Sequence, residues 1–265
     1  MKRIDAVFRS LKKRGEKALI PFITAGDPDL QTTKALALEI AVRGADLLEL
    51  GIPFSDPLAD GPTIQAASNR ALQSGAHLQD ALELAGQLRR ETEIPLILMG
   101  YYNPILQYGL EKTAQDAARW GVDGFIIPDL PLEEAGPWRR TAAEAGIAPI
   151  FLAAPTSGAA RIRKAGRLTR GFLYYVSVTG ITGARRDLPG DLVAALKEVR
   201  SLVACPLAVG FGISTPAQVA GLAPYVDGVV VGSAIVQLVA KLKGPELIKE
   251  VGDFVAALKA PLRGQ

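Results

Sequence analysis

Three acidic residues lie close together around one apolar segment of the sequence. Glu49 stands within residues 47–50, which have the composition of a short buried strand, and Asp56 and Asp60 follow in a loop rich in Gly and Pro. A carboxylate near the end of a buried strand is costly unless it is paired or used in chemistry. Three acids on one strand and its loop favour proton transfer, so Glu49 is a candidate general acid/base and Asp60 a second functional carboxylate.

Each of these acids also has a purely structural interpretation. Glu49 could cap a neighbouring helix or pair with an arginine. Asp60-Gly61-Pro62 could be a turn that starts the next helix, because Pro is favoured in a first helical turn. Side chains alternate along a strand, so Glu49 shares its face with Leu47. Its functional interpretation therefore depends on where the strand ends in the fold.

Eight apolar segments of strand type alternate with segments of helical spacing. Near-continuous apolar runs are typical of parallel strands that are covered on both faces. Eight such units predict an α/β fold, a closed (β/α)₈ TIM barrel that forms a single catalytic domain over residues 1–265. An extra N-terminal helix should precede it, since Ile4, Phe8 and Leu11 have helical spacing. A doubly wound open sheet is the alternative, which the lack of Gly-x-Gly-x-x-Gly after the first strand disfavours. The predicted strands are 19–24, 47–50, 95–99, 124–127, 149–154, 172–176, 206–209 and 228–231.

Glycines follow the seventh and eighth predicted strands. Gly210 and Gly212 come after the seventh strand, and Gly232 and Ser233 come after the eighth. Loops at these two places commonly bind phosphate in barrels, because Gly lets backbone N–H groups approach the oxygens and a helix N-terminus favours negative charge. Ser233 can add a hydroxyl donor. Ordinary turn glycines are the alternative, and we expect a phosphate site.

Several kinds of chemistry are not expected from this sequence. None of the predicted strands contains a lysine, which disfavours a strand-borne Schiff base. The only histidine, His77, falls between two predicted helices, and no cluster of His, Cys and acidic residues is visible, so no catalytic metal is expected. A cofactor-free reaction run by carboxylates remains, with Tyr174 or Tyr175 as a further hydrogen-bond donor.

The composition limits which binding partners and which cellular compartment are expected. The net charge is only +3 and no long basic run occurs, so no nucleic-acid partner is expected. The most apolar late stretch, residues 229–240, is shorter than the ~20 residues needed to span a bilayer, so no membrane association is expected. The single Cys205 cannot form an internal disulfide, and basic residues interrupt the N-terminal segment. We therefore expect a cytoplasmic protein.

The motifs that carry these residues resemble those of one family. Residues 48–62, Leu-Glu-Leu-Gly-Ile-Pro-Phe-Ser-Asp-Pro-Leu-Ala-Asp-Gly-Pro, closely resemble the signature of the tryptophan synthase alpha subunit. Further segments match the same pattern in order and cover nearly the whole chain. These segments are residues 21–28, 101–104, 128–131, 154–157, 179–183, 209–213 and 231–234.

The resemblance implies a lyase that cleaves indole-3-glycerol phosphate to indole and glyceraldehyde 3-phosphate for tryptophan synthesis. It makes Glu49 the general acid/base, Asp60 the acceptor of the indole N–H, and Tyr174 the site tyrosine, since counting back from Gly180 favours Tyr174 over Tyr175. The implied indole-flanking residues are Phe22, Met99 and Ile126, the implied phosphate-binding residues are Gly183, Gly212, Gly232 and Ser233, and Thr182 and Phe211 complete the implied substrate-binding set.

The resemblance also implies a partner. Family members work beside a beta subunit that uses pyridoxal phosphate, in an α₂β₂ complex, while the alpha chain itself needs no cofactor. Loops 52–61 and 179–187 should close over the substrate. Three alternatives remain from the sequence. They are another phosphate-binding barrel such as a sugar-phosphate isomerase, a silent subunit that only activates a partner, and a free-standing indole producer.

Overall fold

All strands in the described part of the chain belong to one parallel sheet. The computed structural model describes residues 2–177, 190–210 and 212–264. Every strand pairing in it is parallel. The strands are β1 (Ala18–Thr24), β2 (Leu48–Gly51), β3 (Leu96–Met99), β4 (Gly124–Ile126), β5 (Ala148–Ile150), β6 (Leu152–Ala153), β7 (Leu173–Val176), β8 (Leu207–Gly210) and β9 (Gly228–Val231).

The sheet closes on itself. Its order is β5-β4-β3-β2-β1-β9-β8-β7-β6. The two ends of that order, β5 and β6, are separated in sequence by Phe151 alone, so together they form one interrupted strand. Counting them as one gives a ring of eight parallel strands among the described residues, as predicted. β1 pairs with both β2 and β9, so the first and last strands complete the closure.

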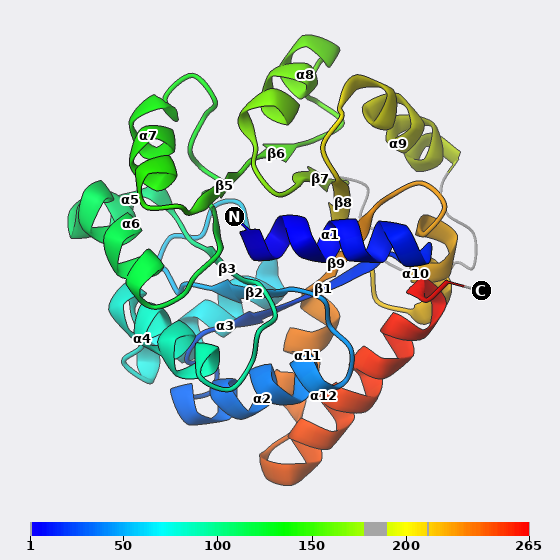
Figure 1. Ribbon diagram of the computed structural model, residues 1–265. Helices are drawn as coiled ribbons and strands as arrows, with labels where there is room; N and C mark the ends of the chain where they lie inside the picture. The colour runs from blue at the N-terminus through cyan, green and yellow to red at the C-terminus, as the bar shows by residue number, and fades with distance from the viewer. Residues whose placement is uncertain (1, 178–189, 211, 265) are drawn as a thin grey trace.

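Helices surround the barrel (Figure 1). Except for α1, they cover the outer surface of the strands, as a parallel sheet requires. The helices are α1 (Lys2–Arg14), α2 (Leu30–Val42), α3 (Pro62–Gln73), α4 (Leu78–Arg89), α5 (Tyr102–Tyr108), α6 (Leu110–Arg119), α7 (Gly136–Glu144), α8 (Ala159–Leu168), α9 (Gly190–Leu202), α10 (Pro216–Leu222), α11 (Ser233–Lys241), α12 (Gly244–Lys259) and the 3₁₀ turn Ala260–Leu262.

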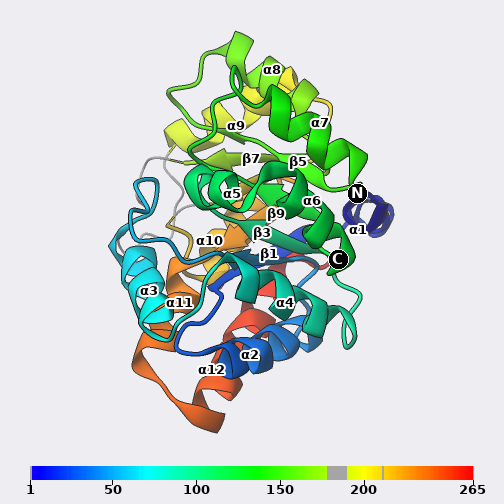
Figure 2. The ribbon, with the colours of Figure 1, turned by 90° about the vertical axis from the view of Figure 1, so that its left-hand side faces the viewer.

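The predicted extra helix, α1, covers one end of the barrel. It lies across the barrel opening in Figure 1 and at the side of the sheet in Figure 2. Its residues Ile4, Phe8 and Leu11 are buried. The ring centroids of Phe8 and Phe172 are 5.7 Å apart. The apolar stripe of α1 therefore seals the amino-terminal end of the barrel, which leaves the opposite end for a site.

Side-chain alternation orients β2 as its sequence predicts. Leu47 joins the apolar cluster inside the barrel, whereas Leu48 and Leu50 join the larger cluster between strands and helices. Glu49 therefore points inward, beside Phe22 of β1, to which it is paired in the strand register.

A buried ion pair closes the amino-terminal rim between β3 and β4. Asp123, just before β4, accepts hydrogen bonds from the Leu96 N–H at 3.0 Å and from Arg89 Nη2 at 2.8 Å. Arg89 also donates to the carbonyl oxygens of Thr92 and Ile94. The pair thus ties the end of α4 to the starts of two neighbouring strands.

The same arrangement recurs twice around the barrel. Asp227, just before β9, accepts from Arg200 and from the first N–H of β8. Asp46, before β2, accepts from Lys259 Nζ at 2.8 Å and from the N–H of the second residue of β1 at 2.8 Å. In the first two cases a basic residue from the helix before one strand meets an acid before the next, whereas Lys259 comes from the last helix, α12. All three pairs fix strand register at the end away from the site.

Arg89→Met should lower the free energy of unfolding by about 3 kcal/mol, because removing one partner of a buried pair leaves a charge poorly compensated. This is the lower end of the usual cost, since Arg3 still contacts Asp123 at 3.3 Å. Urea unfolding measures the change. The control is Arg161→Met, which breaks an exposed pair with Glu133 and should cost less than about 1 kcal/mol. Equal midpoints for the two variants would contradict the importance of the buried pair.

Candidate active site

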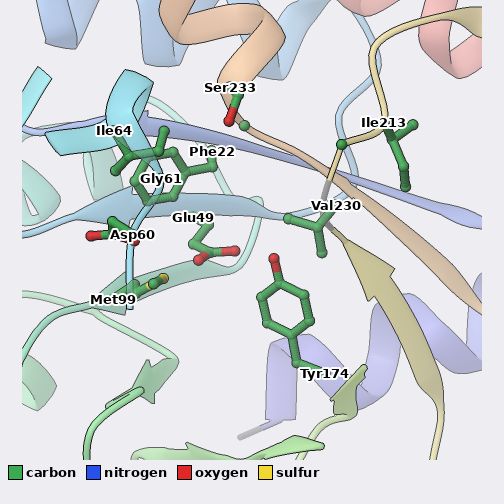
Figure 3. Close-up of a pocket in the computed structure, with 12 residues that line it drawn as sticks. Phe22, Glu49, Asp60, Gly61, Ile64, Met99, Tyr174, Ile213, Val230 and Ser233 are labelled. Atoms are coloured by element: carbon green, nitrogen blue, oxygen red, sulfur yellow. The ribbon is translucent and has the colours of Figure 1, made fainter. Parts of the chain in front are cut away.

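A pocket opens at the carboxyl ends of the strands, opposite α1. It encloses about 580 Å³ of space, part of which is open solvent at its mouth. Five lining residues come from strands: Phe22, Glu49, Met99, Tyr174 and Val230. The other lining residues are Asp60, Gly61, Ile64, Gly212, Ile213, Gly232 and Ser233 (Figure 3).

Glu49 is the buried acid of this pocket. Its exposed fraction is 1%, and burial, followed by the charge of Asp60, raises the pKa of its carboxyl to about 8. Among the described residues its Oε2 atom has no hydrogen-bond partner. Glu49 is therefore protonated at neutral pH and can give a proton to a bound molecule.

Asp60 lies in the loop between β2 and α3 and borders the same pocket. Burial raises the pKa of its carboxyl to about 6, while a hydrogen bond from Tyr101 acts in the opposite direction. Asp60 is thus mostly ionised at neutral pH, when Glu49 is mostly protonated. Two carboxyl groups with separated pKa values can serve as an acid and a fixed negative charge in one site.

Of the two adjacent tyrosines, Tyr174 faces the pocket. Its hydroxyl points toward Glu49 in Figure 3. Burial and the charges of Glu49 and Asp60 raise its pKa well above the ordinary value, so it remains a hydrogen-bond donor. Tyr175 packs instead into the apolar layer between strands and helices. Gly210 makes the position of Tyr174 possible, because a Cβ atom there would overlap the Tyr174 hydroxyl.

The glycines after β8 and β9 meet on one side of the pocket. Gly212 has a φ of 74°, a backbone conformation that favours glycine. Gly232 caps α11, and Ser233 is the first residue of that helix. The free N–H groups and the dipole at a helix N-terminus favour an anion. The predicted phosphate residues Gly212, Gly232 and Ser233 therefore come together at a suitable place.

The remaining predicted residues divide into two groups. Phe22 and Met99 line the pocket. Ile126 is fully buried inside the barrel and is not among the residues that line this pocket. Thr182, Gly183 and Phe211 lie outside the described residues, as does the whole of the predicted loop 179–187.

A second cavity continues from the first, away from the glycines. It shares Asp60, Met99 and Tyr174 with the first pocket. Its other walls are Ala59, Pro128, Leu152, Ala153, Ala154, Ser157 and Val176. Sequence reasoning missed Ile64, Leu152, Val176 and Val230, although the last three occupy the ends of predicted strands. The combined space is polar at the glycine end and largely apolar at the other.

Two other kinds of feature are absent from the described residues. No group of three or more His, Cys, Asp or Glu residues in residues 2–177, 190–210 and 212–264 could hold a metal ion. No helix in the same ranges is long and apolar enough to cross a membrane.

Comparison with known proteins decides the family. Residues 8–259 match the family model described as "Tryptophan synthase alpha chain". The chain belongs to the tryptophan synthase alpha chain family. The resemblance seen in the motifs is therefore confirmed, and the chain is a lyase of tryptophan biosynthesis that cleaves indole-3-glycerol phosphate.

Curated relatives of the alpha chain family match the whole chain. The tryptophan synthase alpha chain of Citrifermentans bemidjiense is 54% identical over 259 residues, which cover 98% of this chain and 97% of the relative. That of Thermoanaerobacter pseudethanolicus is 48% identical over 263 residues, which cover 99% of this chain and all of the relative.

Solved structures of the family share the fold. The tryptophan synthase alpha chain of Legionella pneumophila superposes with a TM-score of 0.91 at 39% identity, over 98% of this chain and 97% of that one. A chain of the tryptophan synthase α₂β₂ complex of Pyrococcus furiosus superposes with a TM-score of 0.87 at 40% identity, over 92% and 98%. The predicted TIM barrel is therefore confirmed.

Proposed function

We propose that Glu49 and Asp60 together carry out the lyase reaction, without a cofactor bound to this chain. The observation that supports this proposal is the pair of carboxyl groups in one pocket, one with a pKa of about 8 and the other of about 6. A carbon–carbon cleavage of this kind needs a proton donor at a ring carbon and stabilisation of the positive charge that results. The pair supplies both.

In the first step, protonated Glu49 gives its proton to C3 of the indole ring. The ring becomes a cation whose charge is centred on its nitrogen, and Glu49 becomes a carboxylate. The ionised Asp60 accepts the ring N–H and stabilises that cation. Because the charge exists only after protonation, Asp60 stabilises the transition state more than the bound substrate.

In the second step, the Glu49 carboxylate removes the proton from the hydroxyl on the carbon attached to the ring. The O–H electrons form the aldehyde of glyceraldehyde 3-phosphate, and the electrons of the broken C–C bond return to the ring as neutral indole. Glu49 ends the cycle protonated, so no net proton is consumed. Tyr174, which keeps its own proton, donates a hydrogen bond next to Glu49.

The two ends of the cavity would orient the substrate. Gly212, Gly232 and Ser233 would bind the phosphate, with Gly183 placed among them by the family resemblance. Thr182 and Phe211 complete the proposed set. Phe22 and Met99 would flank the indole, with the more deeply buried Ile126 behind them, and the apolar cavity beside Leu152 and Val176 offers the ring its room.

Gly232→Val should weaken the binding of glycerol 3-phosphate by tenfold or more. A Cβ atom at this position would lie 3.3 Å from the Phe22 side chain, so the branched residue would crowd both the ring and the phosphate. Ser233→Ala should weaken binding less, because one neutral hydrogen bond contributes only about 0.5–1.5 kcal/mol. Calorimetric titration compares them. Unchanged affinity in Gly232→Val would place the phosphate elsewhere.

We further propose that residues 1–265 form one catalytic domain. The first strand, β1, pairs with the last, β9, and α1 seals one end of the barrel, so both halves of the sequence contribute to the same closed sheet. A cytoplasmic location agrees with the single cysteine.

A beta subunit that carries pyridoxal phosphate is the proposed partner, in an α₂β₂ complex that receives indole directly. The similar chain of Pyrococcus furiosus comes from such a complex. On the loop between β2 and α3, Leu58 is 92% exposed, which is unusual for a leucine and suits a contact surface.

An indole-release assay tests the proposed function directly. The purified chain should release indole from indole-3-glycerol phosphate, and a beta subunit should raise the rate and consume the indole with serine. Absence of indole both with and without the partner would reject the proposal. Indole release that the partner does not change would favour a free-standing lyase.

A further inference from the structure

Tyr101 connects three parts of the active-site loop between β2 and α3. It lies two residues beyond the end of β3 and is 4% exposed. Its hydroxyl oxygen accepts a hydrogen bond from the Ala59 N–H at 3.0 Å, and the hydroxyl donates to the Asp60 carboxylate. Its ring packs against that of Phe54, with centroids 5.3 Å apart. One side chain therefore holds both the early and the late part of the loop.

The hydrogen bonds through Tyr101 run in one direction. A hydroxyl that accepts from a backbone N–H becomes a better donor to a carboxylate, because bonds in a chain polarise one another. The loop itself has little regular structure, and Ser55, Asp56 and Leu58 are exposed. Besides Tyr101, Gln65 also contacts it, through a bond from Nε2 to the Asp60 carbonyl oxygen. That contact fixes the backbone of Asp60 and leaves its carboxylate free to turn.

Asp60 borders two cavities that contain polar groups. It borders the substrate pocket and also a smaller cavity that Thr24 and Ser68 line. Both of these side chains are buried, and the Thr24 hydroxyl has no hydrogen-bond partner among the described residues. Tyr101 lines this smaller cavity and not the substrate pocket, so its hydroxyl meets the Asp60 carboxylate from the side away from the substrate.

We propose that Tyr101 is a positioning residue of the lyase reaction, which holds the Asp60 carboxylate and its loop in the arrangement that stabilises the ring cation. The inference rests on the proposed role of Asp60. It assigns to Tyr101 the anchoring of the Asp60 carboxylate and the coupling of that carboxylate to the loop through Ala59 and Phe54.

The groups around Asp60 determine in which direction the loss of the Tyr101 hydroxyl shifts the pH dependence of activity. Glu49 and Tyr174 face Asp60 across the pocket, and Tyr101 faces it from the end of β3, with Asp129 acting on Tyr101 in turn. A hydrogen bond to the ionised carboxylate favours ionisation, so removing it raises the Asp60 pKa above about 6. The acid limb of the activity profile should then move to higher pH.

Tyr101→Phe keeps the ring against Phe54 and removes both hydrogen bonds. We expect kcat at pH 7 to fall by about 10- to 100-fold, the range for a hydrogen bond to a charged group, with KM changed by less than about threefold. The acid limb should shift upward, and the carboxyl ¹³C resonance of Asp60 should titrate at higher pH. In an Asp60→Asn background the same substitution should change kcat by less than about threefold.

Tyr108→Phe is the matched control. Tyr108 ends α5, and its hydroxyl donates to a carboxylate, that of Asp116, at 2.8 Å outside the pocket. This variant should keep kcat and the acid limb of the wild type.

An unchanged acid limb and Asp60 titration in Tyr101→Phe would overturn the proposal, including the case in which only thermal stability falls. Because the NMR titration needs no turnover, it distinguishes this failure from a failure of the proposed function, in which the wild type itself releases no indole.

Discussion

Glu49→Gln should reduce indole release by at least about 100-fold and by as much as about 10⁴-fold, the usual loss when a general acid/base is removed. Glutamine fills the same space but can neither give a proton to the ring nor take one from the substrate hydroxyl. The structure provides no substitute in the described part of the pocket, where Asp60 is ionised and Tyr174 keeps its proton at neutral pH. Both proton transfers should therefore fail together.

The same variant should be at least as stable as the wild type. The folded protein holds the Glu49 pKa at about 8, above its ordinary 4.5. As pH rises from about 4.5 to 8, the unfolded chain ionises first, so the folded state loses stability across this window, by an amount on the order of a few kcal/mol. Glutamine does not ionise, so the Glu49→Gln variant avoids that loss of stability. The melting temperature of the variant should thus exceed the wild-type value by a margin that grows toward pH 8.

Steady-state kinetics and thermal melts over pH 5–9 measure both effects of Glu49→Gln, with the range set by the two carboxyl pKa values of about 6 and 8. Unchanged affinity for glycerol 3-phosphate would show that the pocket is intact. A variant that kept more than about a tenth of the wild-type turnover would contradict the role of Glu49, since losing a general acid/base costs about 100-fold or more.

The sequence predicted the barrel because its signals are local and repeated. Each strand is a short apolar run, and alternation alone placed Glu49 on the same face as Leu47. These inferences needed only one strand at a time. The structure adds that this face is the inner one, and that a carboxyl without solvent or a cationic partner there has a raised pKa.

Contacts between distant segments were beyond such reasoning. Tyr101 was visible only as part of a motif, because its bond to Ala59 spans 42 residues of sequence. Ile126 pairs in register with Met99, yet only Met99 lines the pocket, since depth in a barrel depends on strand tilt and on the side chains above. The ion pair between Lys259 and Asp46 joins residues that are far apart in the sequence, and no local pattern predicts it.

Separation of the two carboxyl groups into an acid and an anion also needed the structure. Glu49 is buried on a strand without a hydrogen-bond donor, whereas Asp60 lies on a partly exposed loop and receives the Tyr101 hydroxyl. In the sequence these are simply two acidic residues that stand eleven positions apart. The difference in their surroundings decides which of them carries the proton at neutral pH.

Asp60→Asn should lower kcat by about 100-fold while KM changes much less. Asparagine can still accept the ring N–H, so it keeps much of the ground-state binding, but it lacks the negative charge that opposes the ring cation. An interaction that is stronger in the transition state than in the ground state affects kcat, and removing one electrostatic group in a dry site typically costs about 10²–10³-fold. The acid limb near pH 6, which reports ionisation of Asp60, should disappear. The limb set by Glu49 should remain and move to lower pH, because the charge of Asp60 no longer helps to raise the Glu49 pKa.

The matched control for this substitution is Asp56→Asn in the isolated chain. Asp56 belongs to the same loop but is exposed, so its replacement removes an equal charge without changing the pocket. Its turnover and its acid limb should stay within about twofold of the wild type, since exposed charges are screened by solvent. If Asp60→Asn instead raised KM and left kcat unchanged, Asp60 would only bind the indole nitrogen. The stabilisation of the ring cation would then have to come from another group, such as the Glu49 carboxylate that forms when the ring is protonated.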